Sequence, residues 1–118
     1  MSNLSPQSIM DGMAAKNRML TQKNDEYGEL VRKEADAERL YNLAFARVVL
    51  EMKADGQSVT LIKDLVKGDK VVADAKFFWA VATGILKANT ASCKTLSGQI
   101  DTYRSLLAWQ KAEMLRQE

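Results

Sequence analysis

The second half of the chain carries an apolar heptad repeat that continues for six full repeats without a proline. A repeat of this period is typical of a helix that packs along a seam against another helix, as in a coiled coil. Because a helix rises ~1.5 Å per residue, an unbroken helix over residues 69–117 would be about 70 Å long, too long for one globular core to cover. The first seam position is occupied by Val72, Trp79, Leu86, Cys93, Ile100, Leu107 and Met114, and the second by Ala75, Ala82, Asn89, Leu96, Tyr103 and Gln110.

A second long helix is predicted over residues 27–54, where apolar residues recur at steps of three and four. Asp55-Gly56 should end it, because glycine tolerates the left-handed conformation that caps a helix. Ser5 followed by Pro6 is typical of a helix start. The apolar pattern between residues 10 and 24 is loose, however, so residues 1–26 are expected to form a separate N-terminal helix that can be flexible.

Residues 55–68 are predicted to form a connector with one short helix, capped by Ser58 or Thr60 and closed at Gly68. Asp69 is then a suitable N-cap for the long helix that follows. Composition agrees with helix, because 47% of the residues are hydrophobic, only 7% are aromatic and the chain contains one proline. The fold class expected is all-α: an antiparallel helical hairpin forming a single domain over residues 1–118.

The long helix has more apolar surface than one hairpin partner can cover. Gly84 and Gly98 lie inside it, where close approach by another helix is the expected reason for glycine. The apolar surface that the hairpin leaves uncovered predicts a homo-oligomer in the form of a helical bundle. The surplus residues beside the seam are Phe77, Phe78, Val81, Ile85 and Leu106, and the predicted interface residues are Trp79, Leu86, Cys93, Ile100 and Leu107.

Residue types that support catalysis are scarce. The chain has no histidine, which is the commonest general base and metal ligand, and Cys93 is its one cysteine. A lone cysteine without histidine makes neither a nucleophilic dyad nor a zinc site. The nearest approach to a phosphate-binding loop, residues 67–70, has the wrong spacing. The sequence therefore predicts a protein that is not an enzyme, without cofactor or metal.

The lysines suggest a binding function. Net charge is only +2, from 17 basic and 15 acidic residues, which does not by itself identify a nucleic-acid binder. Lysines nevertheless gather around the connector and along residues 75–100, a stretch without acidic residues. Exposed lysines with nearby aromatic rings bind single strands by phosphate contacts and stacking, although Trp79 on the seam is expected to be core. The candidate DNA-binding residues are Lys63, Lys67, Lys70, Lys76 and Lys87.

Two further functions stay open on this pattern. The near-zero net charge favours a protein-binding helical module without nucleic-acid affinity, such as a phage assembly adaptor or an inhibitor of a host protein. A regulator that places a helix in duplex DNA ranks last, because the long helix lacks a dense basic region. No apolar stretch approaches the ~20 residues of a membrane span, and the first ten residues lack a secretory signal, so a cytoplasmic location is expected.

The order of elements also resembles a known family. The chain has a basic and apolar helix around residues 37–44, a glycine-bearing connector and a second helix opened by Gly68-Asp69 that carries Phe77, Phe78, Trp79, Leu86, Cys93 and the run 100–107. Over residues 40–114, about two-thirds of the chain, it resembles the UvsY-type recombination mediators of tailed phages and small helical proteins of prophage recombination modules. The resemblance implies an oligomer of hairpins in the bacterial host cell that binds single-stranded DNA and helps load a recombinase or annealing protein in place of a single-strand-binding protein.

Overall fold

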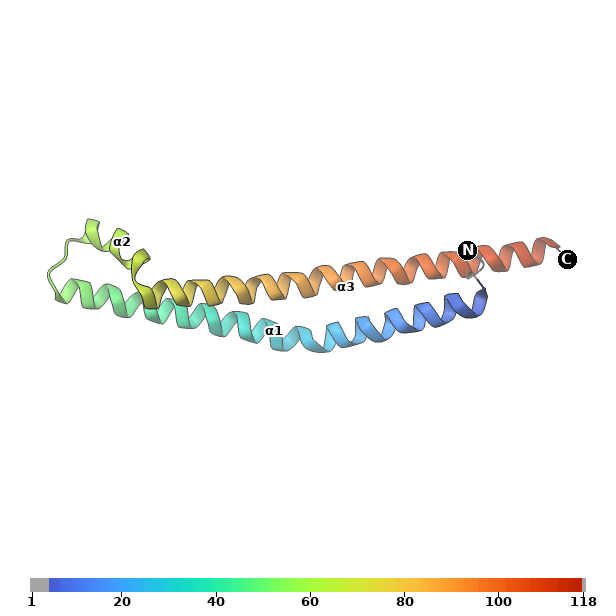
Figure 1. Ribbon diagram of the computed structural model, residues 1–118, viewed down its shortest axis with the longest axis horizontal. Helices are drawn as coiled ribbons and strands as arrows, with labels where there is room; N and C mark the ends of the chain where they lie inside the picture. The colour runs from blue at the N-terminus through green and yellow to red at the C-terminus, as the bar shows by residue number, and fades with distance from the viewer. Residues whose placement is uncertain (1–4, 118) are drawn as a thin grey trace. The chain divides into compact units, whose positions relative to one another are not determined.

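The computed structural model describes residues 5–117, which form three helices and no strand (Figure 1). Helix α1 spans Pro6–Ala54, α2 spans Val59–Gly68 and α3 spans Lys70–Gln117. The predicted all-helical architecture, with two long helices and a short helical connector, is confirmed. Within residues 5–117, no helix is both long enough and apolar enough to cross a membrane.

The two ends of α1 follow the local signals in the sequence. At its start, the Ser8 amide donates to the Ser5 hydroxyl over 3.1 Å, which satisfies one of the free N–H groups of the first turn. At its end, Gly56 adopts a φ of 83°, a left-handed conformation that glycine reaches without strain. This turn lets the Gln57 amide donate to the Met52 carbonyl over 3.1 Å. Both predicted helix ends are confirmed.

Side-chain caps also begin the other two helices. Ser58, rather than Thr60, caps α2 by accepting a hydrogen bond from the Leu61 amide at 3.3 Å. Asp69 caps α3, where its Oδ1 accepts from the Val72 amide at 3.1 Å. Each cap supplies an acceptor to a backbone group that the helix itself leaves unsatisfied. One residue, Asp69, therefore separates the connector helix from the long helix.

The predicted helix boundary at residue 27 is wrong, because α1 continues unbroken from Pro6 to Ala54. The loose segment still has a packed face: Ile9 is buried, and Met13 and Leu20 are half-buried. Its remaining positions are rich in Lys, Gln, Met and Ala, which favour helix even where few side chains pack. Residues 1–4 of the predicted N-terminal helix, and residue 118, lie outside the described residues.

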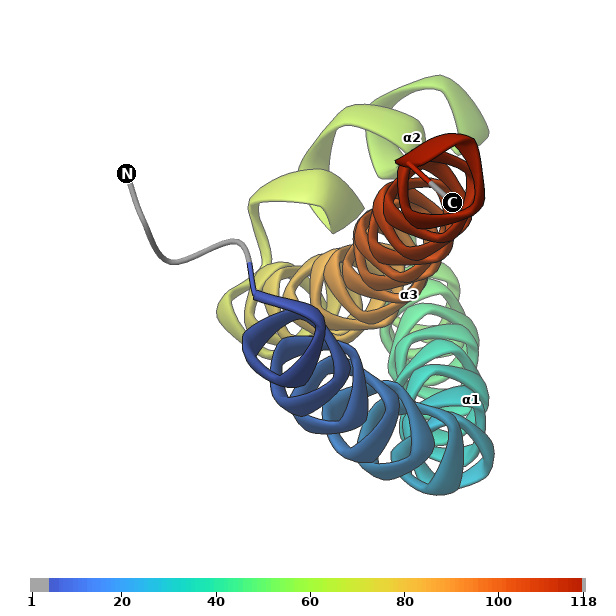
Figure 2. The ribbon, with the colours of Figure 1, turned by 90° about the vertical axis from the view of Figure 1, so that its right-hand side faces the viewer.

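The chain divides into two compact units, each containing part of α1 and part of α3. We call residues 5–27 with 88–117 the terminal unit and residues 28–87 the connector unit. In the terminal unit the two helix segments are antiparallel, because Gly12 lies against Tyr103 while Lys23 lies against Asn89. The connector unit also contains α2, which lies over the last turns of α1 and leads into the beginning of α3 (Figures 1 and 2).

The core of the connector unit is built from all three helices. Val48 of α1, Val66 of α2 and Val72 of α3 form one buried cluster. Ile62 lies one turn before Val66 on α2 and is also buried, as expected for residues four apart on one helical face. Partly buried side chains of α1 surround the cluster, namely Tyr41, Ala44, Val49 and Met52. The connector helix is thus part of the packing and orients the beginning of α3.

Candidate nucleic-acid interface

The predicted DNA-binding lysines all lie in the connector unit, and all are exposed: Lys63, Lys67, Lys70, Lys76 and Lys87. Two of them, Lys63 and Lys67, are four residues apart on α2 and so share one face of that helix. The apolar face of α2, with Ile62 and Val66, is buried. The amphipathic pattern of the connector helix therefore keeps its lysines in solvent.

Acidic neighbours reduce the positive charge of this surface. The Lys70 ammonium lies 2.8 Å from Asp74 Oδ2, one turn further along α3. The hydrogen bond to Asp74, together with its negative charge, raises the pKa of Lys70 above its ordinary value. Residues 59–87 contain five lysines and three aspartates, a difference of +2. The surface is positive but weakly so, and one strand would need several such sites to be held tightly.

Trp79 is engaged inside the connector unit. Its indole Nε1 donates to Glu34 Oε2 over 2.8 Å, and the Thr83 hydroxyl donates to the same oxygen over 3.1 Å. Its ring centroid lies 5.4 Å from that of Tyr41. Both rings are half-buried. Trp79 thus packs against α1 within the chain, as expected for a seam residue.

Two other aromatic rings do reach solvent. Phe77 is 63% exposed and Phe78 is 64% exposed, and their ring centroids lie 5.8 Å apart in an edge-to-face arrangement. From the sequence these residues were assigned only to the apolar surplus beside the seam. The signal that could have found them is their position directly after Lys76 and off the heptad seam.

The residues predicted to form the oligomer interface pack instead within a single chain. Ile100 is buried, whereas Trp79, Leu86, Cys93 and Leu107 are half-buried. Cys93, for example, has its Sγ 3.5 Å from Asn24 Oδ1 on α1. A heptad seam requires a partner helix but does not specify which one, and here α1 of the same chain fills that role. Within one chain these residues therefore pack on the side of α3 that faces α1, and their assignment to an oligomer interface stays a prediction.

Part of the exposed apolar surface of α3 lies in the connector unit, on positions off the seam. Val71, Phe78, Val81 and Ile85 form what we call the apolar stripe, and each is exposed. A shallow groove of about 360 Å³ adjoins it between α1 and α3. The groove is lined by Ala37, Leu40, Val71, Asp74, Ala75 and Phe78. Of the predicted apolar surplus, Phe77, Phe78, Val81 and Ile85 are exposed, whereas Leu106 is half-buried.

A glycine other than the two predicted ones makes room for a side chain of the opposite helix. A Cβ atom placed on Gly84 or Gly98 would meet no atom of residues 5–117 within 4 Å. A Cβ on Gly12 would instead lie 2.7 Å from the Tyr103 Oη, too close for contact without movement. The expectation for Gly84 and Gly98 is wrong within the chain, because both face away from α1. The glycine that lies against a side chain of the opposite helix is therefore Gly12, on α1.

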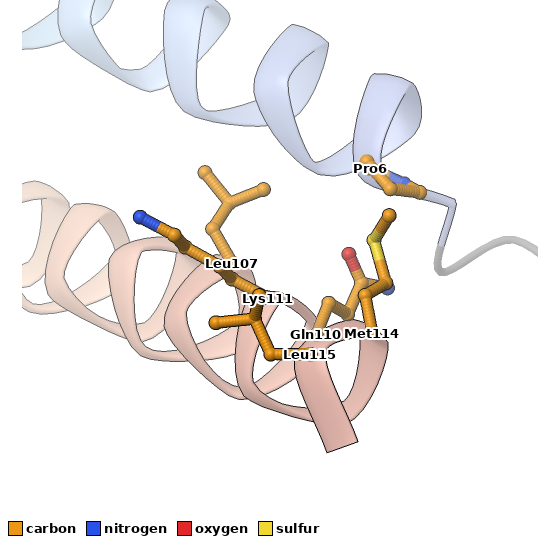
Figure 3. Close-up of a pocket in the computed structure, with 6 residues that line it drawn as sticks. All are labelled: Pro6, Leu107, Gln110, Lys111, Met114 and Leu115. Atoms are coloured by element: carbon orange, nitrogen blue, oxygen red, sulfur yellow. The ribbon is translucent and has the colours of Figure 1, made fainter. Parts of the chain in front are cut away.

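The terminal unit has a partly polar seam. Asn89 is buried, and its Nδ2 donates to the Lys23 carbonyl of α1 over 3.1 Å. At the end of the unit, Gln110 and Met114 extend from α3 toward Pro6 at the first turn of α1 (Figure 3). With Leu107 and Leu115, they line a shallow pocket of about 290 Å³. This open and largely apolar pocket has no cluster of ionisable groups aimed into it.

No protein-family model matches this sequence, and no curated protein or solved structure matches it either. The similarity to recombination mediators thus stays a prediction from the sequence. Within residues 5–117, acidic and cysteine side chains form no group of three or more that could hold a metal ion. The connector unit, with its exposed lysines and phenylalanines, is the best candidate for a binding surface.

Proposed function

We propose that this protein binds single-stranded DNA through the connector unit and acts as a recombination mediator, helping to load a recombinase or annealing protein in a bacterial host cell. The observation that carries the proposal is that all five candidate lysines are exposed within one unit, with Phe77 and Phe78 exposed among them. Lysines neutralise phosphates and exposed rings stack on unpaired bases, the two contacts that single-strand binding combines. The mediator role rests on the sequence resemblance described above.

Repetition is needed for tight binding, because the surface of one chain is only weakly positive. A homo-oligomer would present the same surface several times to one strand. Linked weak sites raise the effective concentration without any new contact, so their combined affinity greatly exceeds that of one site. A partner such as a recombinase or a single-strand-binding protein would then meet DNA already held on this assembly.

Removal of the connector lysines tests the DNA-binding step. Changing Lys63, Lys67 and Lys70 together to Ala should reduce the slope of log affinity against log salt by up to about 2, since each phosphate contact contributes roughly 0.7 for single strands. Fluorescence anisotropy with a labelled oligonucleotide measures the slope. A matched control changes Arg18, Lys94 and Lys111, three exposed cations of the terminal unit, to Ala. An equal effect of both variants, or no binding by the parent, would contradict the proposal.

A second candidate function is a protein-binding helical module, which the apolar stripe and its groove favour. Contiguous exposed apolar surface is typical of protein interaction sites, and grooves between helices accept the apolar face of another helix. A second copy of this chain is one such partner. Changing Ile85, which is 51% exposed, to Asp should lower the oligomer mass without loss of helix, whereas Ala80→Asp on the lysine side should not. Light scattering and circular dichroism measure the two effects.

A further inference from the structure

We propose that Phe77 is the base-stacking residue of the connector unit, with Lys70 and Lys76 as its neighbouring phosphate contacts. This inference rests on the proposed binding of single-stranded DNA and names the side chain that would distinguish a single strand from a duplex. Phe77 is exposed on α3, and it follows Lys76 directly. Its ring adds to a positive surface the flat apolar face that unpaired bases require.

The helical positions place these three residues on neighbouring lines of α3. At about 100° per residue, positions seven apart differ by only about 20°, so Lys70 and Phe77 lie nearly in line, two turns apart. Lys76 lies about 100° from Phe77, on the side away from Phe78. Both lysines are exposed. A strand that follows this side of α3 would therefore pass Lys70, which is paired with Asp74, then the ring, with Lys76 beside it.

Phe78 is the natural comparison, because it is adjacent and equally exposed but faces a different surface. It lines the groove with Leu40 and Val71 and so belongs to the apolar stripe. Phe77 lies one residue earlier, about 100° round the helix toward Lys76. The two rings meet edge to face, with 5.8 Å between their centroids. Phe78→Leu is therefore a control for Phe77→Leu that removes the same ring.

Stacking and charge contribute differently to affinity. A phosphate contact releases counterions, so it changes the salt dependence, whereas a stacked ring changes affinity at every salt concentration alike. Phe77→Leu should weaken binding to a thymidine oligonucleotide about five- to a hundredfold, which corresponds to the ~1–3 kcal/mol of one stacked base. The salt slope should stay at the parent value. Phe77→Tyr should retain parent affinity, because the ring is kept.

The decisive probe is a strand of the same length without bases. An abasic deoxyribose-phosphate strand keeps the charges but offers nothing to stack, so Phe77→Leu and the parent should bind it equally. Phe78→Leu should bind the thymidine strand within about twofold of the parent, well below the loss of one stacked base. Anisotropy titrations at two salt concentrations measure all of these affinities, and light scattering checks that the oligomer mass is unchanged.

The possible failures are distinguishable. If the parent binds with a lysine-dependent salt slope but Phe77→Leu binds the thymidine strand equally well, stacking by Phe77 is wrong and the DNA-binding proposal stands. If the parent binds no single strand, both are wrong. If Phe77→Leu and Phe78→Leu weaken binding equally and both lower the mass, the pair belongs to a protein interface, and the stacking assignment is overturned.

Discussion

The heptad seam of α3 is packed differently in the connector unit and in the terminal unit. In the connector unit a third helix, α2, adds Val66 to the valines of α1 and α3, and the half-buried Trp79 fills the seam beside them. In the terminal unit there is no third helix among the described residues, and the seam contains buried Asn89 and a close approach at Gly12. One unit adds a third helix to its seam, whereas the other fills the seam from two helices, with Asn89 buried in it and the Tyr103 ring packed over Gly12.

This difference explains where the candidate binding surface lies. A pair of helices buries only one stripe of each helix, so further apolar residues on either helix stay in solvent. In the connector unit α2 adds Val66 to the cluster of Val48 and Val72, whereas the groove is lined by residues of α1 and α3 alone. The connector unit, whose core includes a third helix, therefore also carries the exposed rings Phe77 and Phe78.

The largest expected effect comes from a charge in the three-helix core. Val66 is 1% exposed, and Val66→Asp should lower the free energy of unfolding by about 3–5 kcal/mol, because it buries a charge without a partner. Leu65 is the adjacent residue and is 41% exposed, so Leu65→Asp should cost less than about 1 kcal/mol. Chemical denaturation followed by circular dichroism measures both changes.

Val66→Asp, compared with a matching variant of the terminal unit, tests whether the two units are separate. Hydrogen exchange should show that Val66→Asp loses protection over residues 28–87, whereas Ile100→Asp, at a buried position of the terminal unit, should lose it over residues 5–27 and 88–117. Equal loss of protection over the whole chain from either variant would mean that the seam unfolds as one cooperative element, and the distinction between the units would be wrong.

The two tryptophans provide a smaller test, since each unit contains one. Trp79→Phe removes the hydrogen bond from the indole to the Glu34 carboxylate and should cost about 1.5–3 kcal/mol, as for bonds to a charged group. Trp109 is 62% exposed in the terminal unit, and Trp109→Phe should stay within about 0.5 kcal/mol of the parent. Urea denaturation of the two variants checks the comparison. Equal costs would contradict a special role for Trp79 in the connector unit.

Much of the fold follows from local residue chemistry. Ser5, Gly56, Ser58 and Asp69 end or begin helices through contacts within a few residues, so their roles could be predicted from the sequence. The heptad seam was equally predictable from its period. The boundary expected at residue 27 was not correct, because weak apolar spacing does not stop a helix whose residues favour helix and which has a partner along its length.

The tertiary choices could not be predicted in the same way. The heptad period indicates that Ile100 and Leu107 pack against another helix. It does not say whether that helix is α1 of the same chain or a helix of a second copy, because either would bury these residues. The candidate lysines could be selected as exposed because they fall off the apolar face of α2 and α3. The sequence pattern groups Phe77 and Phe78 with the other apolar residues off the seam. Only the packed structure shows that both rings are exposed and that Phe78 lines the groove, whereas Phe77 does not.

The smallest predicted effect comes from Gly→Ala variants, and it tests the contact between Gly12 and the Tyr103 ring in the terminal unit. Gly→Ala inside a helix contributes about 0.8–1 kcal/mol of intrinsic helix propensity. A Cβ at Gly98 meets nothing within 4 Å among residues 5–117, so Gly98→Ala should gain nearly all of this. At Gly12 the new Cβ would lie 2.7 Å from the Tyr103 Oη, so the phenol ring must move. Gly12→Ala should therefore gain less than half as much as Gly98→Ala.

A second substitution shows whether Tyr103 is the cause of that difference. Tyr103→Leu removes the ring atoms that would contact the new Cβ, so Gly12→Ala in that background should regain the full propensity gain of about 1 kcal/mol. Such a double-mutant cycle reports the coupling between the two positions and cancels the separate cost of losing the tyrosine. Urea denaturation of the four proteins gives the coupling energy. If Gly12→Ala stabilises equally in both backgrounds, the Tyr103 ring does not pack over Gly12, and the contrast with the connector unit loses its physical basis.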